Sequence, residues 1–383
     1  MRIQIADLFC GAGGTSEGAL QALRELGYEP MLTAVNHWDL AVKTHTTNHP
    51  DARHFCASVD SLNPRELFAG TQLDFLWASP ECTHHSVARG GKPMLDQSRA
   101  SAHCVTRWAE ALQPRHIMVE NVPEFRQWGP LDLEGRPIPE RKGETFDAWV
   151  GMLRSLGYTV DWRILCAADY GDPTTRKRLF VQAVLHGDTI RWPAPTHDQH
   201  GANGLPRWRP ARDVIDWEIP SQSISERKRP LAPSTVRRIN AGLRKLGMEP
   251  FLISMEHGGR VRSVDRPINT ITTARGGAHA LVEPFVVKFY GTGTFSEIDE
   301  PVDTVTTKSR FGLAEPEVLH DGDNVRLDIR FRMLQPHELA KAQGFPDHYK
   351  FLGNKTQVVK QIGNAVPCGL ARALVMAAMR KES

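Results

Sequence analysis

A cysteine and a glutamate each follow a buried, strand-like run, which is where catalytic groups collect in parallel sheets. Cys82 lies in the loop WASPECTHHS (77–86), just beyond the run LDFLWA (73–78). Glu120 lies near the end of the run HIMVEN (116–121), so both side chains are expected at the carboxyl edge of one sheet. A thiolate nucleophile beside a glutamate indicates covalent catalysis with acid assistance. Taken singly, the cysteine could be a small buried hydrophobe and the glutamate an ion-pair partner.

Two further segments could hold a ligand beside these groups. Arg176 and Arg178 alternate into the run LFVQAV (179–184), and as a set they could hold an anion or a carbonyl oxygen, although each alone fits a surface charge. The glycine-rich stretch DLFCGAGG (7–14) joins a strand-like run to a helical pattern, so its backbone could approach a ligand at the helix N-terminus. The stretch lacks the full G-x-G-x-x-G spacing. NAD, FAD and S-adenosylmethionine are all compatible with it, and so is a tight turn without a ligand.

These groups need a scaffold, and the first 185 residues carry the pattern of one. Short runs rich in Val, Ile, Leu and Phe alternate with helical patterns, which predicts a doubly wound α/β sheet with ligands at the carboxyl ends of its strands. The expected strands are 3–9, 31–36, 73–78, 116–121 and 179–184, and the expected helices are near 14–26, 39–48, 98–112 and 145–156.

The sequence changes character after about residue 186, where Pro, Gly, Trp and Arg become frequent. Ser234 is expected to cap a helix that ends at Gly247. Residues 251–316 hold an internal repeat, in which RPINTITT (266–273) returns 34 residues later as EPVDTVTT (300–307). Thr alternates with Ile or Val in both copies, which favours two β-hairpin units in a smaller, mainly β region. The last segment is helical again and could pack back on the α/β sheet.

Composition excludes several classes of protein. The chain of 383 residues is 40% hydrophobic, which is too much for a disordered chain, and no run approaches the roughly 18 apolar residues of a membrane-spanning helix. Six cysteines without a C-x-x-C pair, and no visible signal peptide, indicate reduced thiols and a cytoplasmic protein. The net charge is only +3, but residues 205–245 hold ten basic against four acidic residues, which fits a solvated helix face or contact with a polyanion equally well.

The chemical motifs resemble those of the DNA cytosine-5 methyltransferases along nearly the whole chain, and they occur in the family's order. Seven motifs of the family have counterparts here. They are the cofactor motif DLFCGAGG (7–14), the nucleophile motif ASPECTHHS (78–86), the glutamate motif ENVPEF (120–125), the connecting motif LGYTVDWRILCAADYG (156–171), the arginine motif TTRKRLF (174–180), and the two closing motifs RMLQPHELAKAQGFPD (332–347) and QIGNAVP (361–367). One match could arise by chance, whereas seven in order are a strong signal.

The resemblance implies a Rossmann-like domain that uses S-adenosylmethionine to methylate carbon 5 of a cytosine flipped out of duplex DNA. Cys82 would add to carbon 6 of the base, and Glu120 would bind the exocyclic amine and protonated ring nitrogen 3. Arg178 would hold the carbonyl oxygen of the base, with Arg176 supporting it. The product would be S-adenosylhomocysteine, and no metal is expected.

Binding residues and domains follow from the same resemblance, together with the basic stretch and the repeat. The catalytic domain is expected to comprise residues 1–188 and 350–383, and the target-recognition domain residues 189–349. The expected cofactor contacts are Phe9, Gly11, Gly13, Gly14, His37, Trp38, Ser58, Val59, Pro80, Asn364 and Val366. The expected DNA contacts are Ser86, Arg99, Lys228, Arg229, Arg275, Arg310 and Arg332.

Several positions depart from the family's pattern. Glu81 replaces the usual proline before the nucleophile, where a carboxylate disfavours a thiolate unless a neighbour such as His84 neutralises it. His37 stands where an acidic residue usually binds the cofactor ribose, Ser58 where an aspartate meets the adenine, and Thr174 where the arginine motif has glutamine. Histidines 45, 49 and 54 lack zinc-ligand spacing and are expected to line a nucleic-acid cleft.

Two other functions remain open. One is an RNA methyltransferase that acts on tRNA. The long middle segment favours a protein that recognises DNA over this alternative. The other is a catalytically silent DNA-binding relative, which Glu81 supports and the intact Cys82, Glu120 and Arg178 oppose. The enzyme is expected to be a monomer, with a cognate restriction endonuclease as a possible companion. The sequence does not give the recognition site.

Overall fold

The computed structural model describes residues 1–80, 100–220 and 334–380. In between it describes mainly the backbone of strands: residues 222–223, 228–230, 233, 251–253, 261–263, 280–281, 285–288, 301, 311–321 and 324–333. The expected nucleophile Cys82 and four of the expected DNA contacts (Ser86, Arg99, Arg275 and Arg310) lie outside the described residues. The helix expected after Ser234 and nearly all of the two repeated strands also lie outside them.

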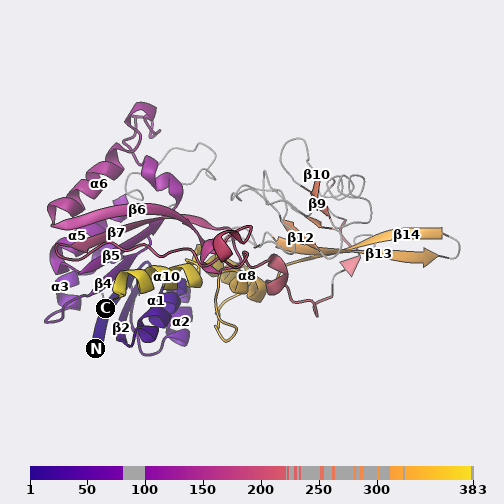
Figure 1. The fold of residues 1–383 in the computed structure, drawn as a ribbon, viewed down its shortest axis with the longest axis horizontal. Coiled ribbons are helices and arrows are strands. Elements are labelled where there is room, and N and C mark those ends of the chain that lie inside the picture. Colours follow the sequence, from indigo (N-terminus) through magenta and orange to yellow (C-terminus); the bar gives the residue numbers. More distant parts are fainter. Residues whose placement is uncertain are drawn as a thin grey trace.

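Seven strands form one mixed sheet that positions the site (Figure 1). Their order across the sheet is β3-β2-β1-β4-β5-β7-β6; the first five are parallel, and β7 is antiparallel to both of its neighbours. All five expected strands are present. Their bounds, with those of the other two, are β1 Arg2–Leu8, β2 Glu29–Asn36, β3 Arg53–Cys56, β4 Phe75–Ala78, β5 His116–Asn121, β6 Tyr158–Cys166 and β7 Lys177–Leu185.

Helices cover both faces of this sheet, which confirms the doubly wound α/β prediction. Figure 1 shows α1, α2 and α10 on one side and α3, α5 and α6 on the other. The four expected helices are present, although α5 begins at His103 after a 3-10 turn over Ala100–Ala102. The helices are α1 Gly14–Glu25, α2 Asp39–Asn48, α3 Pro64–Leu67, α5 His103–Leu112, α6 Glu144–Ser155, α8 Pro336–Ala342, α9 Lys355–Asn364 and α10 Cys368–Met379.

Alternate residues of the central strands fill two separate hydrophobic cores, as the period of two in a strand requires. On β1, Ile3 and Ile5 pack with α1 and α10, whereas Leu8 packs with α5 and α6. On β4, Trp77 belongs to the first core and Leu76 to the second. Because both faces are covered, these strands are continuous hydrophobic runs, which made them visible in the sequence.

The C-terminal helix α10 packs against the N-terminal helix α1. A Cβ atom at Gly18 would lie 2.3 Å from the carbonyl oxygen of Cys368, so only glycine permits this approach. The N-terminus of α10 is capped by a residue far away in the sequence. The buried Asp172 carboxylate accepts hydrogen bonds from the backbone N–H groups of Gly369 and Leu370, at 3.0 and 2.8 Å.

The stretch from Lys355 to Met379 is long and apolar enough, by length and composition alone, to cross a membrane, which differs from the sequence expectation. It contains two helices, because Pro367 separates α9 from α10. The second helix is a core element, since Leu370 and Leu374 are fully buried.

The described part of residues 222–333 forms short antiparallel sheets, as expected of a mainly β region. One sheet has the order β10-β9-β11 and the other β12-β13-β14-β8. Strands β13 and β14 form a hairpin that extends beyond its neighbours as an arm (Figure 1), because β12 pairs only as far as Ala314 and β8 only as far as Arg330. The bounds are β8 Gln222–Ser223, β9 Phe251–Ile253, β10 Val261–Ser263, β11 Ala280–Leu281, β12 Phe285–Lys288, β13 Phe311–Asp321 and β14 Asn324–Met333.

Candidate active site

Glu120 and Arg178 form an ion pair where β5 and β7 lie side by side. The Nε atom of Arg178 is 3.1 Å from Oε1 of Glu120, and the two side chains are 15% and 9% exposed. The antiparallel register explains the contact, because Glu120 pairs with Phe180 and its neighbour Asn121 pairs with Leu179. The structure therefore brings together two of the residues expected to do the chemistry, in a position that is largely shielded from water.

Arg176 lies deeper than Arg178 and contacts the closing segment. It is 4% exposed, and its Nη1 atom donates a hydrogen bond of 3.1 Å to the carbonyl oxygen of Gly363 at the end of α9. Thr174 is fully buried, and its Oγ1 atom has no hydrogen-bond partner among the described residues. The alternation along this segment sends Arg176 and Thr174 inward, so Arg176 fixes the loop before α10.

Asn121 anchors the segment that leads into the expected nucleophile loop, a role that the sequence analysis did not identify. Its Nδ2 atom donates a hydrogen bond of 3.2 Å to the carbonyl oxygen of the buried Pro80, just after β4. Its Oδ1 atom accepts a hydrogen bond from the backbone of Val122. The end of β5 is therefore tied to the segment that leads into Cys82. The only signal in the sequence was its position beside Glu120.

The glycine turn between β1 and α1 is strained and tightly packed. Phe9 has a φ of +63°, in the left-handed region that a bulky residue rarely adopts. Among the described residues, a Cβ atom at Gly11 (φ +54°) would approach only the Phe9 carbonyl, at 4.0 Å. A Cβ atom at Gly13 would lie 2.5 Å from Oη of Tyr349, and one at Gly14 would lie 2.3 Å from the carbonyl oxygen of Val366.

These distances give Gly13 and Gly14 a structural reason, because the closing segment of the chain packs against the turn. Their expected contacts with a cofactor stay a prediction. The same contacts bring the closing segment to the carboxyl end of β1, where Val366 is buried and Asn364 is exposed.

The other expected cofactor contacts follow the ends of neighbouring strands. His37 and Trp38 come directly after β2, and His37 is exposed. The Trp38 ring is half-buried, with Nζ of Lys360 4.7 Å from its centroid, which is a cation–π distance. Ser58 is exposed and Val59 buried after β3. The Val59 carbonyl accepts a 2.7 Å hydrogen bond from Nη2 of Arg107, which holds this loop against α5.

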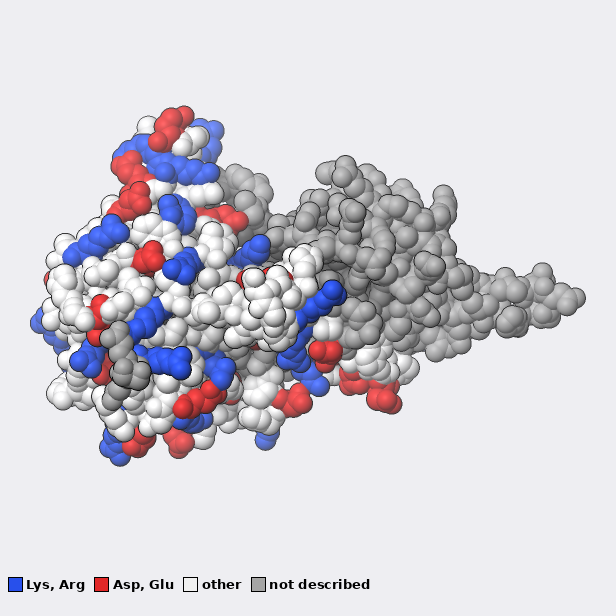
Figure 2. All heavy atoms as spheres, viewed as in Figure 1, with Lys and Arg blue, Asp and Glu red and all other residues white. Residues whose placement is uncertain are grey.

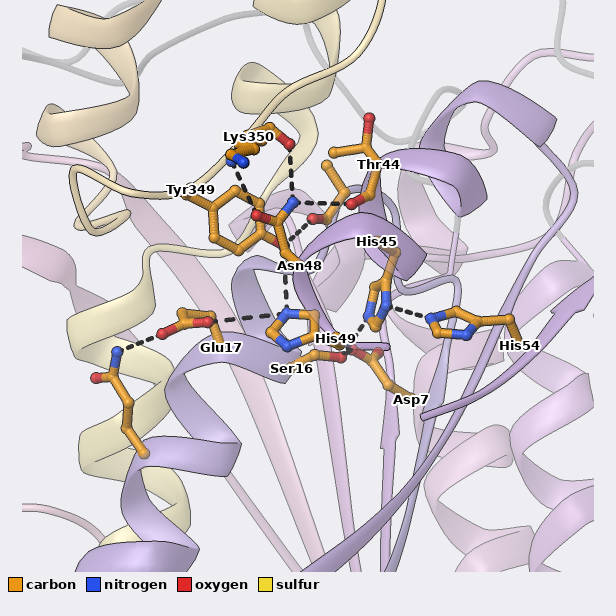
Figure 3. A network of polar contacts seen from close by, with 12 residues as sticks. Asp7, Ser16, Glu17, Thr44, His45, Asn48, His49, His54, Tyr349 and Lys350 are labelled. Atoms are coloured by element: carbon orange, nitrogen blue, oxygen red, sulfur yellow. Dashed lines mark hydrogen bonds and ion pairs between the residues drawn. The ribbon is translucent and has the colours of Figure 1, made fainter. Parts of the chain in front are cut away.

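A buried polar network lies beneath the glycine turn (Figure 3). Oγ of Ser16 is 2.6 Å from Oδ2 of Asp7 and 2.9 Å from Nε2 of His45. Nδ1 of His45 is 2.8 Å from Nε2 of His54. Asp7 is 1% exposed and His45 is fully buried. Burial raises the pKa of the Asp7 carboxyl group to about 7, and it lowers the pKa of His45 well below its ordinary value.

A second arm of the network joins α1 and α2 to the closing segment. Oη of Tyr349 donates a hydrogen bond of 2.5 Å to the carbonyl oxygen of Ala12 and lies 3.3 Å from Nε2 of His49. His49 is also 3.8 Å from Oε2 of Glu17, and burial lowers its pKa to about 4. The expectation that histidines 45, 49 and 54 line a nucleic-acid cleft was wrong for His45 and His49, which are buried groups that support the turn. Among the described residues, no group of three His, Cys, Asp or Glu side chains could hold a metal ion.

Comparison with known proteins identifies the family of the chain. The model of the family described as C-5 cytosine-specific DNA methylase matches residues 3–380. The chain is 27% identical to the type II methyltransferase M.AgeI of Thalassovita gelatinovora, over 96% of this chain and 97% of the relative. It is 25% identical to the type II methyltransferase M1.HphI of Haemophilus parahaemolyticus, over 100% of this chain and 88% of the relative.

A solved structure shows the same fold. The Entamoeba histolytica methyltransferase EhMeth superposes with a TM-score of 0.59 and 15% identity, and the match covers 100% of both chains. At this identity the likeness supports the fold alone.

Proposed function

The chain belongs to the C-5 cytosine-specific DNA methylase family, and from this we propose that it methylates carbon 5 of a cytosine flipped out of duplex DNA, through a covalent adduct with Cys82. Membership of this family makes the chain a DNA (cytosine-5) methyltransferase. The enzymes of the family depend on S-adenosylmethionine. The observation that carries the proposal is the shielded Glu120–Arg178 pair at the carboxyl end of β5, beside the anchored root of the nucleophile loop.

The strand ends fit S-adenosylmethionine, whose sulfonium supplies an electrophilic methyl group. The turn at Gly11, where a Cβ atom would approach only the Phe9 carbonyl among the described residues, is where the cofactor's backbone contacts would be made. Trp38 offers an aromatic surface after β2, and Ser58 offers a hydroxyl after β3. Asn364 lies on the closing segment that packs against the turn. The product would be S-adenosylhomocysteine.

The roles of the catalytic residues follow from the chemistry of the base. Carbon 5 of cytosine is a poor nucleophile, so the Cys82 thiolate would add to carbon 6 and turn the ring into an enamine. Glu120 would bind the exocyclic amine and the protonated ring nitrogen 3, and thereby stabilise charge as it develops. Arg178 holds Glu120 in place and would bind the carbonyl oxygen of the base. After methylation, loss of the carbon 5 proton would expel Cys82.

DNA contacts would come from the basic side chains around the second region. Lys228 and Arg229 are exposed, as phosphate contacts must be. Arg332 lies on β14, where its backbone pairs with Leu313 of β13, and it would be a further DNA contact. On the described face of the catalytic region, basic and acidic side chains are interspersed without a patch of one sign (Figure 2). The Lys228→Ala and Arg229→Ala variants should therefore weaken binding to all sequences and reduce its salt dependence.

Residues 1–188 with 350–383 would form the catalytic domain, and residues 189–349 the target-recognition domain. The enzyme would act as a cytoplasmic monomer on duplex DNA. Type II relatives support a restriction–modification setting, in which a cognate endonuclease would recognise the same site.

Transfer of a tritiated methyl group to unmethylated duplex DNA, followed by bisulfite sequencing, tests the activity and locates the target. The same preparation assayed on tRNA separates DNA from RNA specificity, and a Cys82→Ser variant is the matched control. The proposal predicts transfer to duplex DNA that requires Cys82. Transfer to tRNA alone would contradict it, and transfer to neither substrate would favour a silent DNA-binding relative.

A further inference from the structure

One short segment, residues 172–176, contacts the chain on both sides of the loop between α9 and α10. Before this loop, Nη1 of Arg176 donates a hydrogen bond of 3.1 Å to the carbonyl oxygen of Gly363. After it, the Asp172 carboxylate accepts hydrogen bonds from the first turn of α10. The loop between these contacts, residues 364–367, is named the closing loop. Both of its ends are therefore fixed by the segment that leads into β7.

The closing loop meets the glycine turn between β1 and α1. A Cβ atom at Gly14 would lie 2.3 Å from the carbonyl oxygen of Val366 and 3.0 Å from Cβ of Ala365. The loop also carries Asn364, which together with Val366 is among the expected cofactor contacts. The position of these two residues against the turn therefore depends on what holds the ends of the loop.

The side chain of Asp172 is enclosed by the turn after α8 and the start of α10. Asp172 is 2% exposed. Its Oδ1 atom accepts from the Gly369 backbone at 3.0 Å, and its Oδ2 atom accepts from the Leu370 backbone at 2.8 Å. A Cβ atom at Gly344 would lie 2.2 Å from Oδ1, and one at Gly369 would lie 2.7 Å from Oδ1 and 2.9 Å from Oδ2. Two glycines thus leave room for this one carboxylate.

The carboxylate supplies acceptors that α10 cannot supply itself. The first N–H groups of a helix have no acceptor within the helix. In α10 the N–H of Cys368 donates to the carbonyl oxygen of Gln343, at 2.9 Å, and the next two N–H groups donate to Asp172. Without the carboxylate, the buried Leu370 N–H would lose its acceptor, and the first turn of α10 would have to move to find another.

We propose that Asp172 is a positioning residue for methyl transfer, which holds the closing loop and its cofactor contacts in a fixed position relative to Arg176 and the base-binding Arg178. This inference rests on the proposed function, since it takes the closing loop to be part of the cofactor site. Asp172 acts through the backbone of α10 and contacts neither the cofactor nor the base.

Calorimetric titration of the full chain with S-adenosylhomocysteine tests the inference without requiring methyl transfer. The titration is made at pH 8, because burial raises the pKa of the Asp172 carboxyl group to about 7 and the group must be ionised to accept both hydrogen bonds. Asp172→Ala should weaken binding by about tenfold, the effect of one buried N–H group left without an acceptor. Asp172→Asn should lose less, because its amide oxygen still accepts one of the two hydrogen bonds.

The same titration separates positioning from a merely structural role. If Asp172 only stabilised the fold, Asp172→Ala would lower the number of binding sites per chain and leave the Kd of the folded molecules unchanged. The matched control is Asp169→Ala, on the same turn of the chain, where a half-buried carboxylate accepts a hydrogen bond of 2.9 Å from Nε1 of Trp208. This control should leave the Kd unchanged.

A second variant perturbs the contact while Asp172 stays in place. Gly369→Ala adds one methyl group that would overlap the carboxylate, although alanine is otherwise preferred to glycine in a helix. It should therefore weaken binding about as much as Asp172→Ala. Gly151→Ala is the control, because a Cβ atom there, on α6, would meet no described atom within 4 Å.

The double variant shows whether the two substitutions act on one contact. In the Asp172→Ala background, the methyl group of Gly369→Ala would enter the space that the carboxylate has left, so the double variant should bind no more weakly than Asp172→Ala alone. Losses that add in the double variant would overturn the inference, and so would an unchanged Kd in Asp172→Ala.

Hydrogen exchange gives a further test that needs no cofactor and separates this inference from the proposed function. Mass spectrometry of the peptide covering residues 363–371 should show faster exchange in Asp172→Ala than in the unaltered protein, with exchange in α6 unchanged. Equal exchange of this peptide in the two proteins would overturn the inference. If the unaltered protein binds no S-adenosylhomocysteine, the proposed function fails, and the exchange still decides whether Asp172 holds the closing loop.

Discussion

We expect the free energy of unfolding of the Asp7→Asn variant to rise, relative to that of the unaltered protein, as the pH rises from 4 to 7. Asp7 is 1% exposed, and burial raises the pKa of its carboxyl group from the ordinary value of 3.8 to about 7. Between these two values the folded state holds a proton that the unfolded chain has released, so folding takes up a proton. The contribution of Asp7 to stability is therefore complete below pH 3.8 and is lost as the pH rises to about 7.

The magnitude follows from the difference between the two pKa values. At 1.36 kcal/mol for each pH unit, the interval corresponds to about 4 kcal/mol for a group as buried as Asp7. Asparagine does not titrate, but its second amide N–H lacks a partner in this site and costs about 1–3 kcal/mol at every pH. The variant should thus be less stable than the unaltered protein at pH 4 and more stable at pH 8.

Urea unfolding followed by tryptophan fluorescence at pH 4.5, 6 and 8 measures this difference directly. Asp132 is the control without a pH trend in this range, because the backbone N–H of Arg136 lowers the pKa of its carboxyl group below the ordinary 3.8 and its contribution to stability is therefore complete above that pH. The free-energy difference between Asp132→Asn and the unaltered protein should be nearly the same at all three pH values. A free-energy difference between Asp7→Asn and the unaltered protein that is the same at all three pH values would refute the reasoning.

Three further predictions concern catalysis and target choice. Glu120→Gln should lower the rate of methyl transfer by about two to four orders of magnitude with cofactor affinity nearly unchanged, whereas a tenfold loss of cofactor binding would make Glu120 a cofactor ligand. Glu81→Pro should lower the pH at which Cys82 reacts with a thiol reagent and keep or raise activity, since a nearby negative charge is removed; a folded but inactive variant would give Glu81 a positive role. Arg275→Ala and Arg310→Ala should relax the target sequence seen by bisulfite sequencing, at about 1–3 kcal/mol for each lost guanine contact, and an unchanged preference in both would place target reading elsewhere.

The fold of the α/β region was predictable because its central strands are buried on both faces. Runs such as HIMVEN are continuous and apolar, so they stand out against the helical patterns. β6 was missed because Asp161 and Arg163 interrupt an edge strand that is half exposed. β3 was missed because four residues give too little pattern. The β13–β14 hairpin was missed although its pairing is local, since Asp321 pairs with Asn324 across a connection of two residues.

The residue types of the candidate site could be predicted from the sequence, whereas several contacts between its residues could not. Strand-end positions and the family resemblance pointed to Glu120 and Arg178, which the structure places 3.1 Å apart. The reason for Gly13 was not predictable, because the group that packs against it, Tyr349, is more than 300 residues away in the chain. Likewise, His45 shows no distinctive spacing in the sequence, and only the packing of α2 against α1 reveals that it supports the turn.

The central claim is covalent catalysis by Cys82 on a base held by Glu120 and Arg178. It is tested most directly by incubating the protein with S-adenosylmethionine and duplex DNA that contains 5-fluorocytosine at the target position. Fluorine cannot leave as the carbon 5 proton does, so the account predicts a protein–DNA adduct that survives denaturing electrophoresis and is absent from Cys82→Ser. A preparation that methylates ordinary DNA but forms no such adduct would contradict it.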